Sequence, residues 1–208
     1  MTAPKPPDAC LRVGRILERS HANGPGERFV IWVQGCALAC PGCFNPGLWN
    51  KAGGTDIPVK MLAERINSAH GIRGLTISGG EPLDQAQAVG KLLRLLDPRL
   101  DSVVFSGYSW EEIEADPIKS AALRQADLLI AGRYMRERAS EENPWAGSSN
   151  KTVHALSGRI RCEEFPSCRV EAHIRPDGSA TLTGFPDTGL TAISRANTLQ
   201  SIQDRHET

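Results

Sequence analysis

The sequence lacks the features that would assign it to nucleic acids, membranes or the export pathway. Its 24 basic and 24 acidic residues cancel, so no excess of one charge indicates nucleic acid or an anionic membrane as a partner. No apolar run approaches the roughly 18 residues that a membrane span needs. The first residues lack the charged start, apolar middle and small-residue cleavage site of a secretory signal. We therefore expect a cytoplasmic protein that binds neither nucleic acid nor membrane.

Internal repeats and low-complexity segments are also missing. Hydrophobic residues make up 40% of the chain and charged residues 23%, which is ordinary globular usage and disfavours disorder or a coiled coil. A length of 208 residues is enough to bury a substantial core. We expect one domain with an appendage.

Strand-like and helix-like segments alternate from residue 29 to about residue 131. Alternation of this kind predicts an α/β fold. The predicted strands cover residues 29–33, 75–78, 102–105 and 127–130. The predicted helices cover residues 58–70, run from residue 82 to about residue 96, and start at Ser109 with a capping box. Each strand ends in a polar or glycine-bearing segment, and ligands bind at this end of parallel strands.

The carboxy-terminal quarter has a different pattern. From about residue 137 the sequence turns polar, which indicates a long loop or a boundary. Residues 170–174 and 180–185 flank an Asp177-Gly178 turn and predict a β-hairpin. The residues from 188 onward predict a weak helix or a frayed tail.

Three of the six cysteines fall within eight residues, at Cys36, Cys40 and Cys43. Without an export signal, such a group favours metal binding over a disulfide framework. Gly35 and the Pro41-Gly42 pair allow the loop to wrap tightly around something small. The other cysteines lie far apart in the chain, at Cys10, Cys162 and Cys168.

The residues alone leave two metal groups open at this loop. A structural zinc ion needs four ligands, usually as two pairs, and the sequence lacks a second pair with ligand spacing. Ordinary electron-transfer iron-sulfur clusters take four cysteines, so three would leave one iron free to bind another molecule. This chemistry favours an iron-sulfur cluster. A structural zinc site and unrelated buried thiols are the alternatives.

The CxxxCxxC loop follows one predicted strand, and the next predicted strand ends in Gly79-Gly80-Glu81-Pro82. This combination resembles the radical S-adenosylmethionine superfamily. Finer matches narrow the resemblance to the anaerobic ribonucleotide reductase activating proteins, which are glycyl-radical enzyme activases. They include Gly24-Pro-Gly26, Cys40-Pro-Gly-Cys43-Phe-Asn45, Phe105-Ser-Gly-Tyr108 and Gly147-Ser-Ser-Asn150, and the resemblance covers roughly residues 10–155.

The resemblance implies an α/β fold of the radical SAM type, a short, open partial (β/α) barrel, over residues 1–155. Residues 156–208 are then a C-terminal extension with a β-hairpin and a tail. This extension has no counterpart in the family pattern. Cys162 and Cys168 within it are interpreted as ordinary or redox-sensitive thiols.

The resemblance also implies the cofactors. Cys36, Cys40 and Cys43 would bind a 4Fe-4S cluster, whose remaining iron binds S-adenosylmethionine. No catalytic residue is predicted beyond these ligands. The predicted cofactor-binding residues follow two strands: Gly79, Gly80 and Glu81 after one, and Ser106 and Tyr108 after the next.

The reaction implied by the resemblance is reductive cleavage of S-adenosylmethionine to methionine and a 5′-deoxyadenosyl radical. In the activating branch this radical takes a hydrogen atom from a backbone glycine of a partner, here most simply anaerobic ribonucleotide reductase. An electron donor such as flavodoxin or ferredoxin is a further expected partner. Because the extension is unexplained, direct modification of a peptide or small molecule stays open as the alternative.

Overall fold

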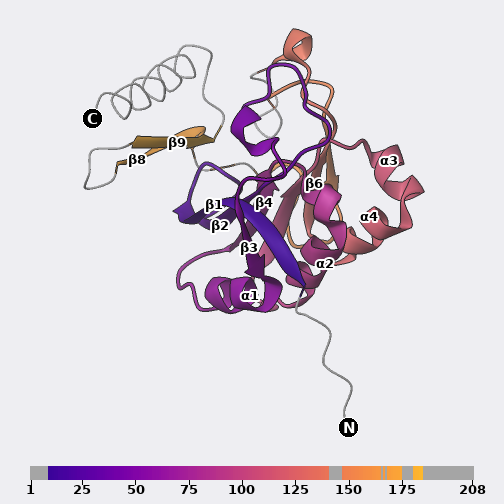
Figure 1. Ribbon diagram of the computed structural model, residues 1–208. Helices are drawn as coiled ribbons and strands as arrows, with labels where there is room; N and C mark the ends of the chain where they lie inside the picture. Colours follow the sequence, from indigo (N-terminus) through magenta and orange to yellow (C-terminus); the bar gives the residue numbers. More distant parts are fainter. Residues whose placement is uncertain (1–8, 141–146, 165, 167, 175–179, 185–208) are drawn as a thin grey trace.

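The computed structural model describes residues 9–140, 147–164, 166, 168–174 and 180–184. Within them, seven strands form one mixed sheet at the centre of the molecule (Figure 1). In spatial order they are β3 (Thr55–Pro58), β1 (Cys10–Ser20), β2 (Arg28–Val33), β4 (Gly74–Gly79), β5 (Asp101–Phe105), β6 (Leu128–Ala131) and β7 (Thr152–Ala155). With its helices, this sheet confirms the predicted α/β class.

The four strands predicted from the sequence are the central ones, β2, β4, β5 and β6, and they pair in parallel. β2 is buried at all its positions, as expected for a strand with apolar contacts on both faces. The sequence analysis missed β1, β3 and β7, which join the sheet antiparallel. β1 was missed because charged and half-buried residues interrupt its apolar pattern.

Four α-helices occur in the described residues, and they are α1 (Val59–Asn67), α2 (Ala86–Arg94), α3 (Trp110–Ala115) and α4 (Pro117–Ala122). Short 3₁₀ turns complete the helical segments, at η1 (Pro46–Leu48), η2 (Pro82–Gln85), η3 (Leu123–Gln125) and η4 (Arg136–Arg138). The helix predicted from Pro82 thus begins as η2 and continues as α2. The predicted capping box at Ser109 and Glu112 is confirmed at the start of α3. No described helix has the length and apolarity needed to cross a membrane.

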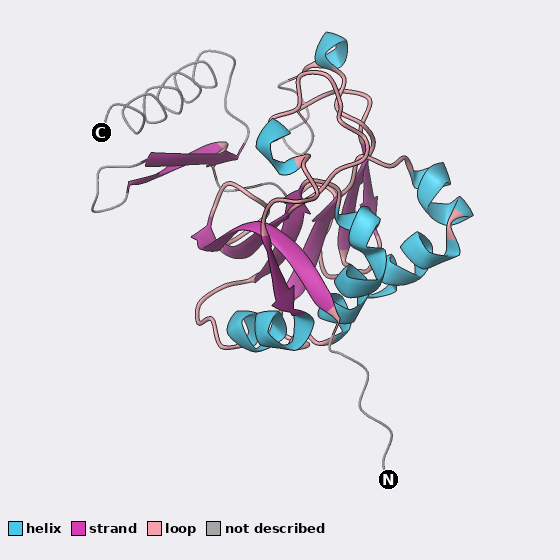
Figure 2. Cartoon of the chain, in the orientation of Figure 1, coloured by secondary structure: helices cyan, strands magenta, loops and turns pink. Residues whose placement is uncertain are grey.

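The two faces of the sheet are covered differently. Val104 of β5 and Leu129 of β6 point into the main core, to which α1 and α2 contribute Leu62 and Val89. The adjacent strand residues Val103, Leu128 and Ile130 form a second, smaller cluster together with Ile160. Since side chains alternate along a strand, the second cluster lies on the opposite face of the sheet. Figure 2 shows the long loops gathered at one end of the sheet.

A buried ion pair ties the other end of the parallel strands together. Arg28 of β2 is fully buried, and its Nη1 lies 2.7 Å from Oδ1 of Asp101 on β5. Its Nε also donates to Thr76 Oγ1 on β4 at 2.8 Å. One side chain therefore links three adjacent strands.

The predicted hairpin is confirmed as β8 (Val170–Ile174) and β9 (Ala180–Gly184), which pair antiparallel beside the body of the molecule (Figure 1). Glu171 of β8 accepts hydrogen bonds from Ser20 Oγ and from the backbone N–H of His21, at 3.0 Å for the latter. Thr183 of β9 accepts from Asn23 Nδ2 at 2.9 Å. The hairpin is thus attached to the turn between β1 and β2. Its own turn and the predicted tail from residue 188 lie outside the described residues.

Candidate functional site

The cysteine loop begins where β2 ends and is held by backbone hydrogen bonds. Gly35 N donates to Leu48 O at 2.8 Å, and Cys36 N donates to Trp49 O at 3.2 Å. Gly35 has a φ of +96°, a left-handed value that glycine adopts without strain. The chain therefore turns sharply at Gly35 and returns along itself through η1.

Gly79 and Gly80 bring the end of β4 against this loop. A Cβ on Gly80 would lie 2.1 Å from Gly35 O, and one on Gly79 would lie 2.5 Å from Val33 N. Gly80 N donates to Val33 O, and Glu81 N donates to Gly35 O, both at 2.8 Å. Glycine is required here because two backbone segments come closer together than any side chain permits.

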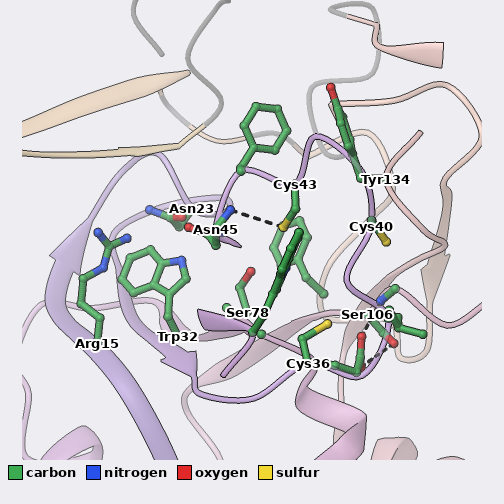
Figure 3. A pocket seen from close by; sticks show the side chains of 18 of the residues that line it. Arg15, Asn23, Trp32, Cys36, Cys40, Cys43, Asn45, Ser78, Ser106 and Tyr134 are labelled. Atoms are coloured by element: carbon green, nitrogen blue, oxygen red, sulfur yellow. Dashed lines mark hydrogen bonds between the residues drawn. The ribbon is translucent and has the colours of Figure 1, made fainter. Parts of the chain in front are cut away.

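One cavity of about 230 Å³ lies at this edge of the sheet (Figure 3). Cys36, Cys40 and Cys43 all line it. The predicted cofactor residues Gly79, Gly80, Glu81 and Ser106 line it as well. The structure thus brings together the three thiols and all but one of the predicted cofactor residues.

The exception is Tyr108, which is not among the residues that line the cavity. Its hydroxyl donates to Asp84 Oδ1 at 2.8 Å, and the other oxygen of Asp84 accepts from Ala37 N at 3.0 Å. Burial and the neighbouring Asp84 raise the pKa of Tyr108 above its ordinary value. Tyr108 therefore supports the cysteine loop through Asp84.

The three thiols surround the cavity without converging on one point. Within the described ranges, no group of three or more His, Cys, Asp or Glu side chains is arranged to hold a metal ion. A single zinc ion would need its sulfur ligands about 2.3 Å away. The thiolates of a four-iron cluster bind different irons and lie further apart. The described residues therefore show no preformed site for a single zinc ion at the three thiols.

The environments of the cysteines differ. Burial raises the pKa of Cys36, and the carboxylates of Glu81 and Asp84 raise it further, although backbone N–H groups oppose them. The sulfur of Cys43 instead accepts the backbone N–H of Asn45 at 3.4 Å (Figure 3). Because metals bind thiolates, metal binding at Cys36 has to displace a proton that this environment favours.

Glu81 is nearly fully buried and connects two strand ends. Its carboxylate accepts from Leu83 N at 2.9 Å, from Ser106 Oγ at 2.8 Å and from Gly107 N at 2.7 Å. Burial raises the pKa of Glu81 to about 7, and these hydrogen bonds oppose the shift. Glu81 therefore sets the position of Ser106 and Gly107 relative to β4.

Two further cavity residues carry polar groups that matter for the site: Trp49, for which the sequence left stacking on adenine or packing open, and Lys151, which sequence reasoning missed. Trp49 Nε1 is buried and has no hydrogen-bond partner within the described residues. Lys151 lines the cavity together with the thiols; burial lowers the pKa of Lys151, and Glu81, Cys40 and Cys43 oppose this shift without cancelling it. A donor and a cation facing three thiols fit a negatively charged iron-sulfur cluster. Lys151 could not be found by motif, since lysine is a common residue type and this one lies far from the cysteines in the chain.

The hairpin also contributes to the cavity, through Leu182, Thr183 and Gly184 of β9. Thr183 is buried against Asn23, which lines the cavity too. No sequence signal could have placed β9 here, because its position depends on contacts with a turn about 160 residues earlier.

The remaining cysteines lie elsewhere. None of the six cysteines, all of which lie in the described residues, forms a disulfide, and Cys10, Cys162 and Cys168 do not line the cavity. Cys162 packs against the second core cluster, and Cys168 N donates to His21 O at 3.4 Å. Their environments agree with their interpretation as ordinary thiols.

Comparison with known proteins identifies the same region. The family described as "4Fe-4S single cluster domain" matches residues 22–154. The anaerobic ribonucleoside-triphosphate reductase-activating protein of Vibrio cholerae is 32% identical over 144 residues, which are 65% of this chain and 92% of that protein. The protein of the same name from Escherichia coli K12 is 33% identical over 144 residues, 64% of this chain and 92% of its own length. The protein of the same name from Enterobacteria phage T4 is 32% identical over 151 residues, which are 69% of this chain and 93% of that protein.

These matches agree with the site. The matched residues contain the three cysteines, the Gly79-Gly80-Glu81 segment and Ser106, whereas the hairpin lies beyond residue 154. The chain therefore belongs to the 4Fe-4S single cluster domain family and, as a member of the radical S-adenosylmethionine type, to the family of anaerobic ribonucleoside-triphosphate reductase-activating proteins.

Proposed function

We propose that this chain is a glycyl-radical activase that binds a 4Fe-4S cluster through Cys36, Cys40 and Cys43 and acts on anaerobic ribonucleotide reductase. The observation that carries the proposal is the common cavity of the three thiols and the Gly79-Gly80-Glu81 segment. When bound, the cluster and S-adenosylmethionine supply one-electron cleavage of the sulfonium to a 5′-deoxyadenosyl radical. The relatives' names supply the reductase as the target.

The chain's own residues hold the reacting groups in place. We propose that Gly79 and Gly80 offer backbone groups to the methionine part of S-adenosylmethionine, since neither has a side chain to block approach. Glu81 and Ser106 line the same cavity and are joined to each other at 2.8 Å. Their mutual hydrogen bond favours a rigid wall, and rigid positioning is what a radical reaction requires of the protein.

The wider predictions from the sequence are part of this proposal. We keep the short, open partial (β/α) barrel over residues 1–155, and the end of the family match at residue 154 supports this boundary. Tyr108 stays a predicted cofactor contact. A flavodoxin or ferredoxin as electron donor and a location in the cytoplasm stay predictions.

The decisive experiment combines anaerobic reconstitution with two readouts. Reduced wild-type protein should contain iron and sulfide and convert S-adenosylmethionine to 5′-deoxyadenosine, whereas Cys40→Ala should lose most of this turnover. Cys10→Ala, an exposed thiol on β1, is the matched control and should retain it. Equal turnover by Cys40→Ala and wild type would refute the ligand assignment.

One observation favours a second candidate, direct action on a peptide. Leu182, Thr183 and Gly184 line the cavity although they lie beyond the family match. An added wall of this kind suits a bound substrate segment. The two candidates differ in the acceptor: a glycyl-radical signal in the electron paramagnetic resonance (EPR) spectrum of added reductase supports activation, and its absence with an active cluster supports the alternative.

A further inference from the structure

Lys151 occupies a fixed place in the cavity wall. It directly precedes β7, at the end of the ladder where Ala131 of β6 pairs with Thr152. Gly132, with a φ of +118°, lies against it, and a Cβ on Gly132 would lie 3.4 Å from Lys151 Cα. The Lys151 side chain lines the cavity together with the three cysteines. Its backbone is therefore held on the sheet while its side chain belongs to the site.

Lys151 has no counter-ion of its own. Among the described residues, no hydrogen bond or ion pair joins its ammonium group to another side chain. By contrast, the buried Arg28 is paired with Asp101. Lys151 is half-buried, and an ammonium group partly withdrawn from water without a partner is unfavourable, so its place in the cavity wall points to a function.

Three groups of potential negative charge act on this ammonium, namely Glu81, Cys40 and Cys43. Glu81 is already engaged by Leu83, Ser106 and Gly107. The two thiols belong to the proposed cluster ligands. The strongest source of negative charge near Lys151 would thus be the cluster with its three thiolates, which becomes more negative by one charge on reduction.

We propose that Lys151 is a positioning residue that compensates the charge of the iron-sulfur cluster and raises its reduction potential. This inference rests on the proposed function. The lysine transfers no electron; the electron comes from the external donor. Its fixed positive charge stabilises the reduced cluster more than the oxidised one, because the reduced cluster is the more negative.

The test compares the midpoint potential of the cluster in three variants with that of wild type, by EPR-monitored redox titration without added S-adenosylmethionine. Lys151→Met should shift the potential to a more negative value by at least a tenfold change in the reduction equilibrium, which is about 59 mV for one electron. Lys151→Arg keeps the positive charge, so the potential of this variant should stay close to the wild-type value. Lys91→Met removes a charge from α2, outside the cavity, and should leave the potential unchanged.

Iron and sulfide content is measured first, so that the two hypotheses fail differently. A wild-type protein without a cluster would overturn the proposed function and this inference with it. Loaded variants in which Lys151→Met has the same potential as Lys91→Met would overturn the inference alone. So would an effect confined to the affinity for S-adenosylmethionine, which would assign the ammonium to the carboxylate of that molecule.

Loading itself is informative. If Lys151→Met fails to assemble the cluster while Lys151→Arg succeeds, assembly depends on the charge and the proposal is supported. If both variants fail, the lysine is needed for its shape, and the proposal is wrong.

Discussion

Two regions with different kinds of attachment enclose the cavity. The sheet body supplies the cysteines and the ends of β4 and β5, and apolar strands buried on both faces hold it together. The hairpin supplies Leu182, Thr183 and Gly184. It is joined to the body by polar contacts. Glu171 accepts hydrogen bonds from the Ser20 hydroxyl and from the backbone N–H of His21, and Thr183 accepts one from the Asn23 side chain.

The difference indicates how the site is built. The body places the cysteine loop through the global fold, so it should lose its geometry only when the whole domain unfolds. The hairpin depends on a few hydrogen bonds, each worth about 0.5–3 kcal/mol, so it can detach locally while the body stays folded. A variant in each region should therefore separate stability of the fold from closure of the cavity.

The largest effect is expected from the buried ion pair of the body. Arg28→Met leaves Asp101 without one of its partners inside the sheet, and breaking such a pair costs about 3–5 kcal/mol. Urea denaturation followed by circular dichroism measures this loss. Arg65→Met is the control, since Arg65 and Glu18 form an exposed pair worth less than about 1 kcal/mol. Similar losses in both variants would contradict the assigned importance of the buried pair.

The next effect concerns the pH dependence of the body. The pKa of Glu81 rises from 4.5 to about 7 on folding because the side chain is buried. The native state therefore binds more protons than the unfolded state in this window, and stability should fall as pH rises from about 4.5 to about 7. Glu81→Gln should remove this contribution, which is at most about 1.4 kcal/mol per pH unit.

Unfolding free energies of the apo-protein at several pH values test the slope. Glu64→Gln, on the exposed side of α1, is the control and should follow the wild-type profile. If the Glu81→Gln profile is also parallel to wild type, Glu81 does not change protonation on folding, and the strand connection at Glu81 contributes no pH dependence.

A smaller and local effect is expected for the hairpin. Glu171→Ala removes the acceptor of Ser20 and of two backbone N–H groups, which should weaken docking by about 1–3 kcal/mol. Hydrogen exchange should then increase in β8 and β9 while β2 and β4 keep their protection. Glu163→Ala, an exposed residue before the hairpin, should change neither. Faster exchange throughout the sheet would mean that hairpin and body unfold as one unit.

The smallest effect is expected when Cys162 and Cys168 are both replaced by serine. Neither residue lines the cavity, so iron, sulfide and S-adenosylmethionine cleavage should stay at wild-type levels. Loss of iron in the double variant would show that the carboxy-terminal region supplies a ligand, and the division of roles between body and hairpin would be wrong.

The sequence predicted the parts of this protein that depend on local pattern. β2, β5 and β6 were recognisable by their short apolar runs, as expected for strands covered on both faces. β4 was recognisable by Leu75 and Ile77 and by the glycines that follow. The hairpin was recognisable by its turn residues and its flanking segments. β1 was not, since its charged and half-buried residues give no apolar pattern, and only its pairing with β2 and β3 shows that it is a strand.

The candidate site divides in the same way. Cysteine spacing and the glycine pair are short motifs, and they were enough to predict the family and, through that resemblance, the iron-sulfur cluster. The tertiary structure decided the other features of the site. They are the burial of Glu81, the unpaired N–H of Trp49 within the described residues, the place of Lys151 in the cavity wall and the docking of β9. The physical reason is that a motif records which groups are adjacent along the chain, whereas burial, charge neighbours and a shared cavity arise only when distant segments pack together.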